Sequence, residues 1–116
     1  MGAWDIAIFA EDVNVDFLDE LAALDDDGVI EGVEDACLLA RQEAATEDER
    51  LNGLAAATIA AIWAGAPFSA GDVADAYPFV RGLIGSGTDQ LSEVATELLE
   101  NADTDEDLEV YLEALS

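Results

Sequence analysis

The sequence predicts an all-α fold: a compact bundle of five or six helices around a central alanine-rich helix. Two observations carry this prediction. Apolar residues recur at helical spacing along most of the chain, and residues typical of helix starts precede several of these stretches. With 116 residues, of which 52% are hydrophobic, the chain is long enough to bury one core. We therefore expect a single domain spanning residues 1–116.

The first half of the chain holds a short N-terminal segment and two predicted helices. Residues 4–9 alternate Trp4, Ile6 and Ile8 with Asp5 and Ala7, which predicts a short extended segment that lends its large side chains to the core. The first helix is expected to begin at a capping Asn14. Its apolar face comprises Phe17, Leu18, Leu21 and Leu24. The second is expected to follow Asp27-Gly28, with Asp27 as its cap, and its apolar stripe comprises Val29, Ile30, Val33, Cys37, Ala40 and Ala44.

The central helix is expected over residues 50–65. Thr46-x-x-Glu49 is a capping box at its start, and Gly65 and Pro67 end it. Residues 51–71 carry no charge, which raises the alternative of a membrane span. We reject a span because its unbroken apolar part, residues 54–68, is rich in alanine and shorter than the roughly 20 strongly apolar residues that a membrane requires.

Three further helices are indicated in the second half. Ser69-x-x-Asp72 can begin a short helix that Pro78 interrupts. Thr88 is the expected cap of the next helix, whose apolar face comprises Leu91, Val94, Ala95, Leu98 and Leu99. Thr104-x-x-Asp107 is expected to open the last one, which bears Leu108, Tyr111, Leu112 and Leu115.

Charge is the dominant feature of the composition. The chain has 28 acidic residues against three arginines and no lysine, a formal net charge of −25. Such a field repels nucleic acid phosphates and anionic lipids, so we expect neither direct nucleic-acid binding nor membrane binding. The partner that it attracts is a basic protein. We also expect that salt or divalent cations stabilise the fold by screening the repulsion among the carboxylates.

The missing residue types restrict the chemistry. Without histidine there is no imidazole base, and without lysine there is neither a Schiff base nor a P-loop lysine. Cys37 is the single cysteine, so no intrachain disulfide or thiolate zinc cluster can form. We expect a non-enzymatic protein without a cofactor. The composition still permits an enzyme that uses only carboxylates. A glycosidase, which hydrolyses its substrate with a pair of carboxyl groups, is an example. A free cysteine and an N-terminus unlike a secretory signal indicate the cytoplasm.

One stretch, residues 23–34, partly matches a calcium-binding loop. Aligned by Gly28, it offers four acidic side chains at ligand positions: Asp25, Asp27, Glu31 and Glu34. The first position of the loop is Ala23, where a carboxylate is needed. The alternative is an aspartate-rich turn that caps the following helix.

Two other features have both a functional and a structural interpretation. Cys37 lies on an apolar stripe, which favours a buried, inert thiol over a redox sensor. Tyr77, Phe79 and Arg81 form an aromatic cluster in the least acidic region and can serve as an interaction patch. The alternative is that these side chains pack across one end of the bundle.

The N-terminus resembles a family signature. The first 17 residues are similar to the N-terminal motif of a bacterial family known as domain of unknown function 4259. The matching positions are Gly2, Trp4, Phe9, Asp12, Asp16 and Phe17. The chain departs from the motif at Asp5 and Ala7, where the family tends to have glycine, and at Glu11. The resemblance implies a small, mostly helical, cytosolic bacterial protein without assigned activity, and related small acidic proteins often accompany toxins as immunity or antitoxin partners.

These observations lead to three function hypotheses. The first is a non-enzymatic protein-interaction module that covers a basic partner, as an immunity protein, an antitoxin or an acidic mimic of nucleic acid. The second is a weak divalent-cation binder that uses residues 25–34. The third is a housekeeping domain whose acid-rich surface has no specific ligand.

Overall fold

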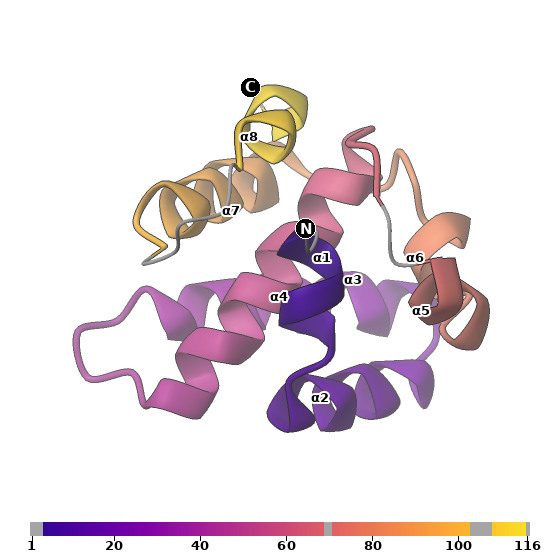
Figure 1. The fold of residues 1–116 in the computed structure, drawn as a ribbon, viewed down its shortest axis with the longest axis horizontal. Coiled ribbons are helices and arrows are strands. Elements are labelled where there is room, and N and C mark those ends of the chain that lie inside the picture. Colours follow the sequence, from indigo (N-terminus) through magenta and orange to yellow (C-terminus); the bar gives the residue numbers. More distant parts are fainter. Residues whose placement is uncertain (1–3, 69–70, 103–107, 116) are drawn as a thin grey trace.

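The structure is a computed structural model and describes residues 4–68, 71–102 and 108–115 (Figure 1). The described residues form eight helices and no strand, which confirms the all-α prediction. The helices are α1 (Trp4–Phe9), α2 (Asp12–Ala22), α3 (Asp26–Ala40), α4 (Glu47–Trp63), α5 (Gly71–Ala76), α6 (Phe79–Gly82), α7 (Asp89–Glu100) and α8 (Glu109–Leu115). The count exceeds the expected five or six because α1 is helical and the residues around Pro78 form two short helices.

Helix α4 is the centre of the molecule. It runs diagonally through the middle of Figure 1, and α1, α2, α3, α6, α7 and α8 all pack against it. Its small side chains allow this close approach from several sides, because alanine adds little bulk beyond the backbone. The residues of α4 that are fully or almost fully buried include Ala55, Ala56, Ala57, Ile59, Ala60, Ala61, Ile62 and Trp63. The molecule is nearly equal in its three dimensions, at 31 × 30 × 29 Å.

Local capping chemistry sets several helix ends as predicted. The capping box of Thr46 and Glu49 is formed, with the Thr46 hydroxyl accepting from the Glu49 backbone N–H at 3.1 Å. Thr88 caps α7 in the same way, through the backbone N–H of Leu91. Helix α4 ends at Trp63, and Gly65 follows with a φ of +110°, a conformation that favours glycine.

Two predicted caps are wrong. Helix α2 begins two residues before Asn14, whose side chain is buried and donates to the carbonyl of Ile8 at 2.8 Å. Asn14 therefore ties α2 to α1. Helix α3 begins earlier than expected, because Asp25 and not Asp27 is its N-cap: the Asp25 carboxylate accepts from the backbone N–H of Gly28 at 2.8 Å. The Ser69 start and the Thr104-x-x-Asp107 start lie outside the described residues.

The N-terminal segment is helical, so the extended segment predicted for residues 4–9 is wrong. A lone strand would leave its backbone groups without partners, whereas a helix satisfies them internally. The helical turn also changes which side chains face the core. Trp4, Asp5, Ile8 and Phe9 are buried, while Ile6, predicted to be in the core, is 48% exposed.

Trp4 joins α1 to the central helix through one polar contact. Its indole N–H donates to the hydroxyl of Thr58 at 2.8 Å, and that hydroxyl also bonds to the Leu54 carbonyl. We expect Trp4→Phe to lower the free energy of unfolding by about 1–2 kcal/mol, since it removes a buried hydrogen bond and some packed volume. Urea denaturation followed by circular dichroism measures this loss.

Ile6→Ala, on the same helix, is the matched control. Because Ile6 is half exposed, its truncation should change stability by less than about 0.5 kcal/mol. Equal losses for the two variants would contradict the orientation of α1.

Candidate functional site

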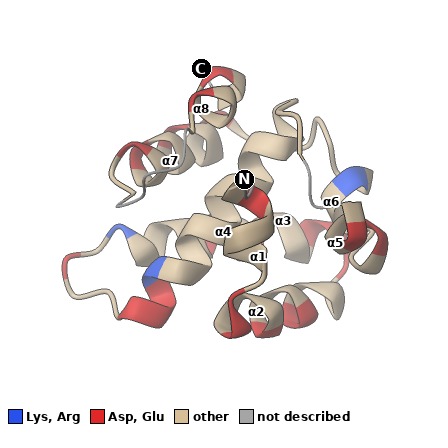
Figure 2. Cartoon of the chain, viewed as in Figure 1, with Lys and Arg blue, Asp and Glu red and all other residues tan. Residues whose placement is uncertain are grey.

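Acidic residues recur along α2 and α3 (Figure 2). These two helices carry nine carboxylates and no basic residue. Eight of them are exposed: Asp12, Asp16, Asp19, Glu20, Asp26, Asp27, Glu31 and Asp35. Such a face attracts cations and basic surfaces at long range.

The three arginines offset little of this charge. Arg41 pairs with Glu97 at 3.4 Å and Arg81 with Asp75 at 3.1 Å, in both cases between side chains that are about half or more exposed. Exposed pairs of this kind typically contribute less than about 1 kcal/mol. Arg50 makes no ion pair with a carboxylate of the described residues. The repulsion among the carboxylates is therefore mostly uncompensated within the chain.

This charge predicts a strong salt dependence of stability. Raising sodium chloride from low to near-molar concentration shortens the screening length from about 30 Å at 0.01 M to about 3 Å at 1 M. We expect the melting temperature to rise by at least about 5 °C over that range, because added salt weakens the repulsion among the carboxylates of the folded chain. Scanning calorimetry measures it, and an unchanged melting temperature would contradict the prediction.

The residues of the predicted calcium loop lie mostly on one helix. Asp25 is the N-cap of α3, and Asp27, Glu31 and Glu34 follow within the helix itself, so residues 26–34 do not form a loop. The Asp25 carboxylate is already used in capping. Within the described ranges, no three acidic or cysteine side chains converge as a group that could hold a metal ion. Cation binding by this stretch stays a prediction that no contact in the structure favours.

The aromatic cluster joins the short helices α5 and α6 to α2. The rings of Tyr77 and Phe79 are 6.0 Å apart, and the Tyr77 hydroxyl donates to Asp19 at 2.5 Å. This hydrogen bond raises the pKa of Tyr77. The Arg81 guanidinium lies 5.5 Å from the ring centre of Phe68. These internal contacts agree with the packing interpretation, and a role as an interaction patch stays a prediction.

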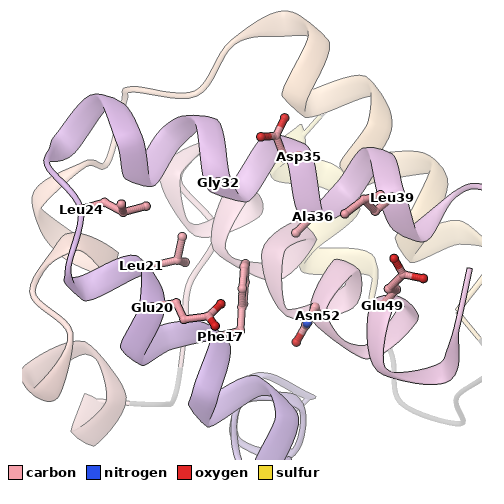
Figure 3. Close-up of a pocket in the computed structure, with 10 residues that line it drawn as sticks. All are labelled: Phe17, Glu20, Leu21, Leu24, Gly32, Asp35, Ala36, Leu39, Glu49 and Asn52. Carbon is pink, nitrogen blue, oxygen red and sulfur yellow. The ribbon is translucent and has the colours of Figure 1, made fainter.

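A cleft between α2, α3 and the start of α4 was not predicted from the sequence (Figure 3). Its volume is about 280 Å³. Apolar or small residues form most of its wall: Phe17, Leu21, Leu24, Gly32, Ala36 and Leu39. The polar residues that line it are Glu20, Asp35, Glu49 and Asn52. The cleft thus combines an apolar interior with acceptor groups and contains no basic side chain.

The described residues of the N-terminal motif lie in two different settings. Trp4, Phe9 and Phe17 are buried in the core, whereas Asp12 and Asp16 are exposed on α2. Gly2 lies outside the described residues. Of this set, only Phe17 also lines the cleft.

Together, the fold and its surface define a small all-α protein with a strongly acidic exterior. No helix among the described residues has the length and hydropathy needed to cross a membrane. The chain belongs to the DUF4259 family, since the family model described as Domain of unknown function (DUF4259) matches residues 2–114. This confirms the family that the resemblance implied. No curated protein and no solved structure matches the chain.

Proposed function

We propose that this protein is a non-enzymatic interaction module of the cytoplasm that binds the basic surface of a partner protein. The observation that carries the proposal is the face formed by α2 and α3, where eight exposed carboxylates stand without any basic residue. Carboxylates in this density speed the encounter with a basic surface and disfavour acidic competitors.

The concrete versions of this function differ in what the partner does. An immunity protein or antitoxin would cover a basic active surface of a toxin. An acidic mimic would occupy a nucleic-acid-binding surface, since carboxylates spaced along helices present a charge pattern similar to that of phosphates. Each version requires a partner rich in arginine or lysine.

The absence of lysine from the sequence makes a selective cross-linking experiment available. A carbodiimide joins carboxylates directly to nearby amines. The only amine of this chain is its N-terminus. Any lysine that becomes joined to one of its carboxylates therefore belongs to another protein. We expect carbodiimide treatment in a cell extract to give adducts whose linked peptides come from α2 and α3.

The captured partner is then purified and its affinity measured by calorimetry. We expect the dissociation constant to rise on the order of tenfold between low and physiological salt, as for complexes steered by charge. Adducts without basic sequence around the linked lysine, or an affinity that is independent of salt, would contradict the proposal.

A further inference from the structure

The cleft between α2 and α3 exposes apolar surface that the fold leaves uncovered. Leu24 is 49% exposed and Leu39 is 45% exposed, and both lie at its edge (Figure 3). Leaving leucine surface in water costs free energy, roughly 25 cal/mol for each Å². A partner group that covers these two side chains therefore gains apolar contact.

Close packing at Gly32 shapes the cleft. A Cβ at this position would lie 2.8 Å from Cδ2 of Leu21, which is closer than side-chain atoms normally approach. The backbone of α3 thus lies directly over the Leu21 side chain of α2. Phe17 and Ala36 extend this apolar wall toward α4. This apolar wall offers contact to the aliphatic part of a long side chain.

The polar groups of the cleft call for a donor and a positive charge. Glu20 and Asp35 are exposed, and neither has a basic side chain within 4.0 Å among the described residues. The Oδ1 atom of Asn52 is buried and accepts no hydrogen bond in the part of the chain that the structure describes. Buried acceptors in folded proteins nearly always have a hydrogen-bond partner. An N–H group of a bound molecule would supply the donor that Oδ1 of Asn52 lacks.

We infer that the cleft binds an arginine side chain of the partner. This inference rests on the proposed function and names the part of the acidic face that recognises the partner most specifically. The aliphatic stem of arginine packs against Leu21, Leu24 and Leu39, and the guanidinium reaches the carboxylates at the rim. Arginine fits better than lysine because its planar fork donates to two oxygens at once.

The first experiment titrates the full ¹⁵N-labelled chain with the peptide acetyl-Gly-Arg-Gly-amide. We expect saturable shifts of the backbone amides of Leu21, Gly32 and Leu39. The same peptide with citrulline, which keeps the shape and loses the charge, should give no saturable shift. Shifts that are equally large on α7 and α8, or equal binding of the citrulline peptide, would overturn the inference.

Two matched pairs of variants separate this cleft from charge in general. Leu39→Gln should raise the dissociation constant of the arginine peptide about tenfold, whereas Val110→Gln, also at a 45% exposed side chain, should leave it unchanged. Glu20→Gln with Asp35→Asn should weaken binding more than Glu93→Gln with Glu100→Gln, which removes the same charge from α7. Equal effects within either pair would overturn the inference.

Capture of the partner by variants of the cleft tests the arginine site separately from the proposed function. If Leu39→Gln leaves the capture of a basic partner unchanged, the cleft is not its arginine site, and the proposed function stands. If no basic partner is captured while the arginine peptide still saturates the cleft, the proposed function fails and the cleft remains an arginine site.

Discussion

Gly53→Ala is expected to lower the free energy of unfolding by about 1–2 kcal/mol. Gly53 lies in the middle of α4, where a Cβ would stand 2.1 Å from Cβ of Ala40 and 3.2 Å from the carbonyl oxygen of Ala36. To admit that methyl group α3 and α4 must separate, and such overpacking costs about 1–3 kcal/mol or more. The gain of about 1 kcal/mol in helix propensity offsets part of this cost. Urea denaturation of the variant measures the balance.

A double variant shows whether the contact with Ala40 causes the loss of stability in Gly53→Ala. Ala40→Gly removes the atom that lies closest to the added methyl group. The double variant should therefore be more stable than the sum of the two single effects predicts, with a coupling of at least about 1 kcal/mol. Gly82→Ala is the control, because a Cβ there meets nothing within 4 Å. No coupling, or a Gly53→Ala variant as stable as the original chain, would contradict this account of the α3–α4 contact.

The same contact shows which parts of the fold the sequence could predict. Alanine in the central helix indicated that neighbours approach closely, and the structure confirms this. Nothing in the sequence distinguished Gly53 from a residue that merely weakens a helix. The distinction depends on Ala40, which lies on another helix, and therefore on the way in which the two helices cross.

Helix ends were likewise predictable where they depend on nearby residues and not where they depend on another helix. The caps Thr46 and Thr88 were predicted correctly because each depends on a hydrogen bond to a residue three positions later. Asn14 was predicted incorrectly because its side chain bonds to Ile8 of the preceding helix. Among the consecutive aspartates 25–27, the sequence could not show which one caps α3, since each is a good N-cap residue.

The candidate site was harder to predict than the fold. The acidity of the surface was evident from composition, but the cleft was not. Leu24 belongs to the apolar stripe of the first predicted helix and was expected in the core; it is instead 49% exposed at the cleft edge. Helix α2 ends at Ala22, so Leu24 lies in the turn and departs from the direction that helical spacing assigns to it. A cleft that three helices form together leaves no local pattern in any one of them.

Alkaline pH is expected to destabilise the protein through Cys37. This thiol is fully buried between α3 and α4, and it contacts the carbonyl oxygen of Gly53 at 3.9 Å. Burial, and then the negative charge of Glu34, raise the pKa of Cys37 from 9.0 to about 12. This agrees with the prediction of an inert buried thiol, since the thiolate is the reactive form.

The sign of the effect follows from proton binding. Above the ordinary thiol pKa the unfolded chain has lost this proton and the folded chain has kept it, so the folded state binds more protons. The free energy of unfolding then falls as pH rises, by about 1.4 kcal/mol for each pH unit and by roughly 4 kcal/mol in total by the folded pKa. The contribution of Cys37 is fully present below the unfolded pKa and is lost as pH rises toward the folded pKa of about 12.

This chain suits the measurement because it has no lysine or histidine to titrate in the same window. The other groups of the chain that can ionise at alkaline pH, two tyrosines and the N-terminal amine, are also present in the Cys37→Ala variant, so their contribution is common to both proteins. Urea denaturation of both proteins at pH values from 8 to about 11 isolates the thiol. We expect the curve of the original chain to fall steeply and that of Cys37→Ala to be much flatter. Parallel curves would mean that the thiol ionises in the folded state almost as easily as in the unfolded one, and that the contact between α3 and α4 admits water at Cys37.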